Sequence, residues 1–371
     1  MYIYDQVQED TLYIILYSIV TAMNAVAGVY LLLRRGNAFA ADVTPPLRLR
    51  RWTAAFMMVC ALGHLWYIPA VVSDSSEAAM LGMMIGGLLD CLLTIPLALI
   101  VMLCMLQDRR RPLWPIGVAV APLVAGIAVC IVTRFDALLP WVRGYFLLAA
   151  VGFTIYMVRE VRRYGRWLRD NYADLEHKEV WRSFLVVTVI MLLFAYYVVG
   201  YGGMTYEYII QLSDLLLIGY LLWRVETLSS LTPDQSLPPA PSPSGEGIDY
   251  IRGEADAANE KIASLLKQHC EDAQLYLQHD LTVSQLAQAI GTNRTYLRLY
   301  FVHQDTNYNA YINDLRIRHF IRLYTEAVAA QRFFTVQGLA TQSGYRSYST
   351  FALAFKQRMG KSVMEWKQKD G

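Results

Sequence analysis

The sequence predicts an all-α protein in two parts: a polytopic bundle of seven membrane-spanning helices, followed by a tandem helix-turn-helix domain. Two observations predict this fold. The first 225 residues contain seven apolar runs of about 20 residues, the length that crosses roughly 30 Å of hydrocarbon as a helix. The last third of the chain contains one ten-residue pattern twice, beginning at Thr282 and again 53 positions later at Thr335.

The predicted spans explain the composition, because 55% of the residues are hydrophobic and most of this excess precedes residue 225. The first span is too long, and begins too late after the acidic Asp5, Glu9 and Asp10, to be a cleaved signal peptide with a basic start. The lipid bilayer is therefore one expected partner. The seven predicted spans are residues 11–33, 52–72, 79–106, 113–133, 141–158, 183–203 and 206–223.

The connections between the predicted spans differ in positive charge. One set, at 34–51, 109–111 and 159–182, holds 15 Arg and Lys residues, whereas the other set holds only Arg134 and Arg143. Arg and Lys accumulate on the cytoplasmic side of membrane proteins. We therefore expect a bacterial inner (cytoplasmic) membrane protein with its N-terminus outside and its C-terminal part in the cytoplasm, where DNA is.

Each copy of the repeated pattern is typical of a short helix with its own start and stop. Thr282 and Thr335 are expected to cap the helices. Gly291 and Gly344 are expected in the turns that follow, where positive φ is needed. A second amphipathic helix follows each glycine, and in helix-turn-helix proteins that second helix enters the DNA major groove. From residue 273 onward the sequence holds 12 Lys and Arg residues but only 6 Asp and Glu residues. This excess of positive charge suits binding to phosphates.

Composition also predicts the domain boundaries. Residues 228–250 are rich in Pro, Ser and Gly and have too little apolar content to pack, so we expect a flexible linker. It would separate a membrane sensor domain over 1–227 from a DNA-binding domain over 251–371. Within the latter, the repeats cover 281–303 and 334–360.

Two further helices are predicted around the repeats. Apolar residues at helical spacing predict an amphipathic helix over 255–277 and a long helix between the repeats, from Tyr308 to Tyr324. The other face of the long helix is basic, which is compatible with a solvated face and with contact to DNA phosphates. Its basic residues are Arg316, Arg318, His319 and Arg322.

Three stretches carry a family resemblance. Residues 281–297 hold the first repeat and the start of the next helix, and residues 311–317 read Tyr-Ile-Asn-Asp-Leu-Arg-Ile. Residues 344–363 follow the pattern G-[FY]-x-S-x-S-x-F-x-R-x-F-K-x-x-x-G-x-[ST]-P at most positions. Together they resemble AraC/XylS-type transcription regulators, of the membrane-embedded variety. The resemblance implies double-stranded DNA and RNA polymerase as partners, allows a homodimer, and implies no enzymatic activity and no cofactor.

The family pattern also implies which residues contact DNA. Arg298 is the strongest candidate, because Arg pairs bidentately with guanine O6 and N7; a solvated surface arginine is the alternative. The implied base-facing residues are Thr295, Arg298, Leu299, Ser349, Thr350 and Leu353. The implied phosphate contacts are Asn293, Arg294, Arg346 and Lys356, and the expected core aromatics are Phe301, Phe351, Phe355 and Trp366.

Two positions depart from the family pattern. Leu353 stands where the pattern has Arg, and Val363 stands where it has Pro. Because Leu353 has no hydrogen-bond donor, we expect the second recognition helix to contribute phosphate contacts or a thymine-methyl contact.

Polar residues inside the predicted spans are costly in hydrocarbon and are candidates for function. Glu207, Gln211 and Asp214 are spaced so that they share one helix face. Such residues could form a pocket that senses a small ligand or a proton, or they could hold the spans together. The complete candidate set is Asn24, His64, Asp90, Glu207, Gln211 and Asp214.

Several membrane chemistries lack the residues that they need. Lys178, the only lysine among the first 223 residues, lies outside the predicted spans, so no retinal Schiff base can form within one. His64 is the only histidine in a span, so two histidines cannot hold a haem there. Neither HExxH nor GxxxxGK[ST] is present. The five cysteines lack metal-site spacing, so no metal is expected: Cys60, Cys91, Cys104, Cys130 and Cys270.

We therefore expect a membrane-bound, sequence-specific transcription regulator that couples a signal sensed by the spans to gene expression. The alternative is a membrane transport or scaffold protein whose C-terminal module serves protein interaction, which the departure at Leu353 motivates. DNA binding by the C-terminal part alone would separate the two hypotheses.

Overall fold

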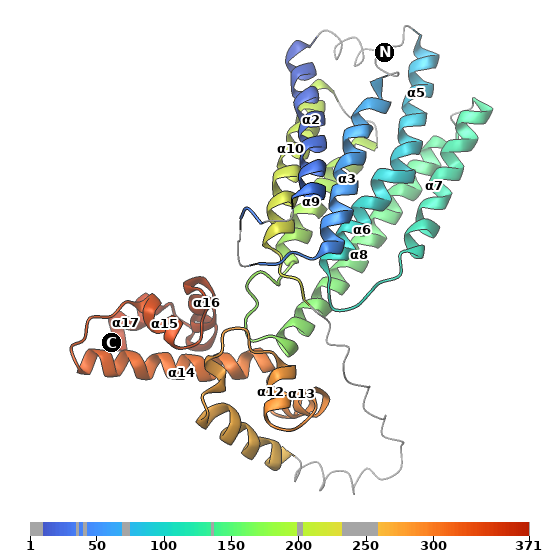
Figure 1. Cartoon of the computed structure of the whole chain (residues 1–371). Helices are drawn as coiled ribbons and strands as arrows, with labels where there is room; N and C mark the ends of the chain where they lie inside the picture. Colours follow the sequence, from blue (N-terminus) through green and yellow to red (C-terminus); the bar gives the residue numbers. More distant parts are fainter. Residues whose placement is uncertain are drawn as a thin grey trace, which may run out of the picture. The chain divides into compact units, whose positions relative to one another are not determined.

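The computed structural model describes residues 10–34, 37–39, 43–68, 75–134, 137–198, 203–231 and 259–370. The described residues are mostly helical, as the sequence predicts, and contain no β-strand (Figure 1). The chain divides into two compact units: unit 1 is Met1–Tyr164 with Val180–Pro233, and unit 2 is Gly165–Glu179 with Asp234–Gly371. Asp5, Glu9 and most of the predicted linker, residues 232–250, lie outside the described residues.

Unit 1 is built from long helices that pack side by side (Figure 1). Helix α2, Thr11–Leu33, begins where Asp10 accepts a hydrogen bond from the Tyr13 N–H at 3.0 Å. It packs along α3, Leu47–Trp66, and along α10, Met204–Thr227. These three helices carry most of the polar candidates of the predicted spans.

The remaining helices of unit 1 complete the bundle. Helix α5, Ser76–Leu89, runs through a π-helical turn at Asp90–Thr94 into α6, Ile95–Met105, and packs on α7, Trp114–Thr133. Helix α8 covers Leu139–Asn171, and helix α9, Trp181–Val198, packs against α10.

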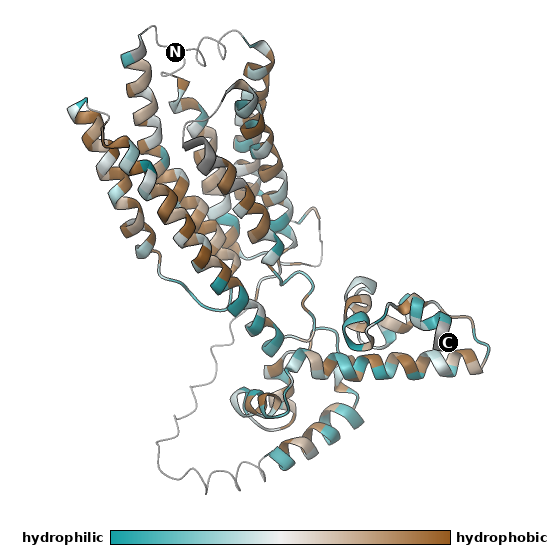
Figure 2. Ribbon diagram, turned by 180° about the vertical axis from the view of Figure 1, so that it is seen from behind, coloured by the Kyte–Doolittle hydropathy of each residue, from teal (hydrophilic) through white to brown (hydrophobic). Residues whose placement is uncertain are grey.

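Five helices among the described residues are long and apolar enough to cross a membrane: Thr11–Leu33, Glu77–Met105, Trp114–Thr133, Leu139–Asn171 and Met204–Thr227. Many of their hydrophobic side chains are exposed, and Figure 2 shows long stretches of the unit 1 helices in brown, the colour of hydrophobic residues. Leu12, Trp114 and Leu148, for example, are 70–71% exposed, which fits contact with lipid. The predicted spans 52–72 and 183–203 correspond to α3 and α9 but run on into residues that are not described, so the count of seven stays a prediction.

The structure corrects the arginine-rich connection that the sequence analysis placed over 159–182. Helix α8 continues through the first half of this predicted connection and ends only at Asn171. Loss of apolar character marks the end of a membrane-spanning stretch, but Arg, Glu and Leu are good helix formers, so the helix itself goes on. Within unit 1, Glu160 of this extension is buried and accepts hydrogen bonds from Arg109 and Arg111, each as close as 2.8 Å.

Unit 2 is organised around one long helix, α14, Tyr308–Ala329, which confirms the helix predicted between the repeats. Figure 1 shows two pairs of shorter helices along it. The first pair is α12, Val283–Ala289, and α13, Arg294–His303; the second is α15, Val336–Gln342, and α16, Tyr348–Met359, followed by α17, Val363–Asp370.

The amphipathic helix predicted over 255–277 is described from residue 259 and is not regular to its end. It is α-helical to residue 266, π-helical over Lys267–Asp272, and ends in a 3-10 turn at Leu275–Leu277. Gln274, in the left-handed region at φ 54°, separates the last two segments. Apolar spacing thus predicts the buried Ile262, Leu266 and Tyr276 but not the backbone break at Gln274.

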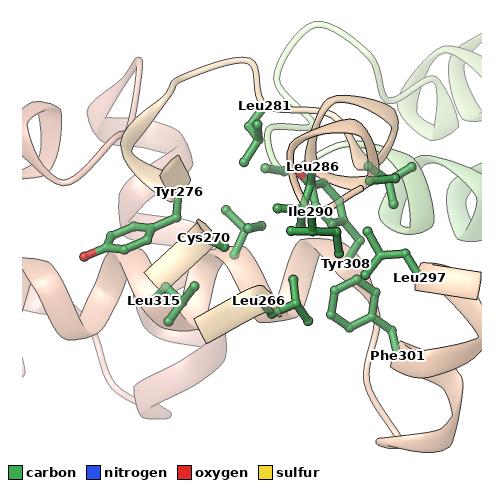
Figure 3. Close-up of a cluster of buried hydrophobic side chains, with 14 of the residues drawn as sticks. Leu266, Cys270, Tyr276, Leu281, Leu286, Ile290, Leu297, Phe301, Tyr308 and Leu315 are labelled. Atoms are coloured by element: carbon green, nitrogen blue, oxygen red, sulfur yellow. The ribbon is translucent and has the colours of Figure 1, made fainter. Parts of the chain in front are cut away.

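Each half of α14 has its own hydrophobic core. The first core contains Leu286, Leu297, Phe301 and Tyr308, and Figure 3 shows these side chains converging between the helices of the first pair and α14. The second core is aromatic, and its members include the remaining predicted core residues. The prediction is confirmed for all four, which are at most 6% exposed: Phe301, Phe351, Phe355 and Trp366.

Arg316 does not belong to the exposed basic face that the sequence predicts for α14, because it is buried within unit 2. Its side chain is 1% exposed and donates hydrogen bonds to the carbonyl oxygens of Tyr276, at 2.8 Å, and Gln278, at 2.7 Å. Tyr276 lies in the 3-10 turn that ends the broken helix and Gln278 directly follows it, so the guanidinium binds carbonyl oxygens at a helix end. His319 is also buried, with its Nδ1 2.9 Å from the Tyr276 hydroxyl, and burial lowers its pKa.

Candidate functional site

The two helix pairs of unit 2 share one local construction. Thr282 accepts a hydrogen bond from the Gln285 N–H, and the Gln285 side chain accepts one from the Thr282 N–H, a reciprocal cap at the start of α12. Thr335 caps α15 by accepting a hydrogen bond from the Gly338 N–H at 3.0 Å, and Gly338 has no side chain that could return it. Gly291 and Gly344 follow with φ of 71° and 90°. The predicted caps and turn glycines are confirmed.

Helix α13 presents three of the predicted DNA contacts on one exposed face. Asn293 begins the helix by accepting a hydrogen bond from the Tyr296 N–H at 3.0 Å, so its side-chain oxygen is already in use as a cap. Leu297 is fully buried, which fixes the rotation of the helix. The opposite face is exposed, and it carries Thr295, Arg298 and Leu299.

Helix α16 is placed in the same manner. Ser347 caps it by accepting a hydrogen bond from the Thr350 N–H at 3.2 Å, and Phe351 and Phe355 turn inward to the second core. Leu353 is 58% exposed, although it is apolar. The other exposed members of the predicted set on or beside this helix are Arg346, Ser349 and Lys356, whereas Thr350 is half-buried.

Two of the predicted DNA-contacting arginines make ion pairs within unit 2. The Arg298 guanidinium lies 2.9 Å from a carboxylate oxygen of Asp170, and that of Arg346 lies 2.7 Å from Asp280. Both arginine side chains are still almost half exposed, at 44% and 46%. Each pair is therefore a solvent-screened contact that another anion can replace.

Two acidic residues that were not among the sequence-based predictions contact this surface. Asp170 accepts a hydrogen bond from the Arg298 guanidinium. Glu176 accepts hydrogen bonds from the hydroxyl of Thr350, at 2.8 Å, and from that of Ser347. Both come from Gly165–Glu179, which comprises the end of α8 and most of its connection to α9 and belongs to unit 2. The sequence feature that could have indicated them is the cluster of acidic residues from Asp170 to Glu179, directly after a stretch rich in arginine.

In unit 1 the structure pairs five of the six polar candidates of the predicted spans. Asn24 donates a hydrogen bond to Asp214 at 2.9 Å, connecting α2 to α10. His64 Nε2 lies 3.2 Å from the Gln211 side-chain oxygen, connecting α3 to α10. Glu207 accepts a hydrogen bond from the Tyr13 hydroxyl at 3.2 Å. Together these pairs form a ladder of polar contacts along one face of α10.

The sixth candidate, Asp90, lies at the π-helical turn between α5 and α6. It accepts hydrogen bonds from the Tyr67 hydroxyl at 2.6 Å and from Thr94 at 2.9 Å. Among the described residues no hydrogen bond joins Asp90 to Asp214, so the two carboxylates have separate partners. Polar contacts of this type hold membrane helices together, and they also place ionisable groups where a bound ligand or proton would change the packing.

Comparison with protein-family models, with curated proteins and with solved structures found no match to this chain. The resemblance to AraC/XylS-type regulators therefore rests on the motif residues themselves. Within the described ranges, no three or more His, Cys, Asp or Glu side chains are grouped so that they could hold a metal ion.

Proposed function

We propose that this protein is a membrane-bound, sequence-specific DNA-binding transcription regulator of the AraC/XylS type. Unit 1 would receive a signal at the inner membrane of a bacterium, and unit 2 would bind double-stranded DNA in the cytoplasm and contact RNA polymerase. A regulator of this kind is not an enzyme and needs no cofactor.

The observation that carries the proposal is the equivalence of the two helix pairs. In each, a capped first helix leads through a glycine turn into a second helix that buries one face and exposes the other. The exposed faces of α13 and α16 carry hydroxyl, basic and apolar side chains, the groups that contact base edges and phosphates. Two such helices on one rigid α14 favour contact with two successive stretches of major groove.

The proposed roles differ between the two helices. On α13, Arg298 would pair with a guanine, with Thr295 and Leu299 beside it, while Arg294 would contact a phosphate. On α16, Ser349 and Thr350 would meet base edges, and Leu353 is suited to a thymine methyl group rather than to a polar base edge.

The experiment that tests the function is DNA binding by residues 251–371, after circular dichroism has verified that the fragment is helical. We expect selection from random duplexes to yield one common sequence. Affinity for it should fall linearly with the logarithm of salt concentration, because Lys and Arg release counterions from DNA. A helical fragment that binds no duplex even at low salt would contradict the proposal.

The runner-up function is membrane transport or scaffolding, with unit 2 as a protein-interaction module. One observation favours it: Leu353, 58% exposed on α16, would suit an apolar protein partner. The same fragment separates the two, because an interaction module would give no selected DNA sequence.

A further inference from the structure

We propose that the segment Gly165–Glu179, which comprises the end of α8 and most of its connection to α9, is a built-in inhibitor of the DNA site on unit 2. It docks on the two helix pairs and places carboxylates on the side chains that would otherwise meet DNA. This inference rests on the proposed DNA-binding function and states how that same site is regulated.

The segment is anchored to unit 2 through its backbone around Ala173. This residue is 1% exposed and belongs to the first hydrophobic core. Its N–H donates to the Leu281 carbonyl at 3.4 Å, and its own carbonyl accepts a hydrogen bond from the Asn309 side chain at 2.7 Å. Next to it, Tyr172 forms an isolated antiparallel bridge with Thr282. Backbone pairing together with a buried side chain fixes one register, so the segment has a defined site on unit 2.

Two carboxylates flank this anchor, and each reaches a different predicted recognition helix. Asp170 pairs with Arg298 of α13 at 2.9 Å. Glu176 accepts hydrogen bonds from Thr350, at 2.8 Å, and from the α16 cap residue Ser347. A carboxylate oxygen accepts from the same donors that would bind guanine O6 and N7 or a phosphate oxygen. Docking of the segment and of DNA at these side chains is therefore mutually exclusive.

The two carboxylates also act through their charge. The segment as a whole is nearly balanced, because Gly165–Glu179 holds four acidic residues against Arg166, Arg169 and Lys178. Asp170 and Glu176, however, lie at the side chains of α13 and α16 that would meet DNA, where a negative charge opposes the approach of phosphates.

The position of the segment in the chain connects the inhibition to unit 1. Asp170 lies in the last turn of α8, and α9 begins at Trp181, so the segment continues at both ends into helices of unit 1. A signal that changes the ends of these two helices would change how well the segment fits its site. The apparent affinity for DNA then follows the fraction of molecules in which the segment is undocked.

The test uses the full-length protein in lipid nanodiscs and a duplex chosen with the 251–371 fragment. Asp170→Asn combined with Glu176→Gln removes both carboxylate charges and changes side-chain size very little. If at least 90% of wild-type molecules are docked, the double variant should bind about tenfold tighter or more. The matched control is Asp305→Asn combined with Glu326→Gln, which removes two charges from exposed positions of unit 2 that do not contact the segment.

Asn309→Ala provides a variant without any change of charge. It removes the side chain that donates to the Ala173 and Tyr172 carbonyls but leaves every predicted DNA contact intact. It should likewise tighten DNA binding in the full-length protein, and hydrogen exchange should show faster exchange of the Ala173 amide. Addition of the duplex to wild-type protein should have that same effect on Ala173.

The outcomes separate the two proposals. Tighter binding by the double variant and by Asn309→Ala, with the control at the wild-type value, supports the inhibitory segment. Equal affinity of wild type and both variants overturns it while the DNA-binding function stands. If neither the full-length proteins nor the folded fragment binds any duplex, the proposed function fails, and the inhibitory role fails with it.

Discussion

Gly291 and Gly344 hold equivalent places in the two repeats, but their surroundings differ. Both have positive φ, at 71° and 90°, where a side chain is strained. A Cβ atom on Gly291 would meet open space, whereas one on Gly344 would lie 2.9 Å from the backbone of Leu277 and 3.1 Å from the buried Arg316. The second glycine is therefore required for packing as well as for the turn.

We predict that Gly344→Ala destabilises residues 251–371 by at least about 2 kcal/mol, since left-handed strain and a backbone clash add. Gly291→Ala is the matched control, with a cost of roughly 1–2 kcal/mol from strain alone. Urea unfolding followed by circular dichroism measures both. Equal losses would mean that the close approach of Leu277 does not constrain the position.

Arg298 is the residue on which sequence-specific recognition most depends in the proposed function. Arg298→Ala in the 251–371 fragment should cost about 1–3 kcal/mol of binding and relax preference at a single base pair, the value of a bidentate arginine–guanine contact. Arg294→Ala, at a predicted phosphate contact, should instead weaken binding evenly across sequences. Binding to a panel of single-base variants of the selected duplex distinguishes these patterns. An even loss for Arg298→Ala would assign it to the phosphate backbone.

At the scale of elements, the sequence predicted what depends on local pattern. Caps, turn glycines and the long α14 follow from residue types at fixed spacing, and the structure has them. The end of α8 and the burial of Arg316 were not predictable in this way. The first follows from helix propensity beyond the apolar stretch, and the second from carbonyls about forty positions away in sequence. The docking of Asp170 and Glu176 on unit 2 is likewise a tertiary contact without a local signature.

A substitution on α16 can test whether this second recognition helix lies deep in the DNA major groove. Leu353 is exposed on the same helix as Ser349, where the family pattern has Arg. Leu353→Arg adds a donor there and should tighten fragment binding or change the base preference in one half of the site, by about 1–3 kcal/mol. Met364→Arg, which adds the same charge at a 72% exposed position outside the predicted DNA contacts, is the control. Unchanged affinity and preference with an intact fold would show that α16 contacts only the backbone.

At the scale of the whole molecule, the orientation of unit 1 decides whether unit 2 can reach DNA. The charge asymmetry of the connections predicts the N-terminus outside and the C-terminal part in the cytoplasm. Fusions of a compartment-specific reporter before Met1 and after Leu228 should therefore report opposite sides of the membrane. The same compartment for both would make the number of spans even and would leave the proposed function without its access to DNA.

The polar ladder along α10 is where a signal would act on the whole protein, because α10 packs on α2 and α9 and is the last helix before the connection to unit 2. Asp214→Asn keeps an oxygen that can accept from Asn24 but removes the negative charge. A ligand or proton shifts a two-state protein only through its different affinity for the two states. We therefore predict that this variant alters the output of a reporter that carries the selected duplex and alters its response to external pH. DNA binding by the fragment stays unchanged.

Asp90→Asn provides the comparison, because Asp90 has its own partners, Tyr67 and Thr94. Both carboxylates also lie within electrostatic reach of His64, so the effects of the two variants on the reporter should be non-additive. Immunoblots of membranes decide between sensing and packing. If Asp214→Asn simply depletes the protein, the ladder holds α2, α3 and α10 together, and the signal must enter elsewhere in the bundle. If the protein level is normal and the output is fixed at one value, the charge of Asp214 is part of the switch.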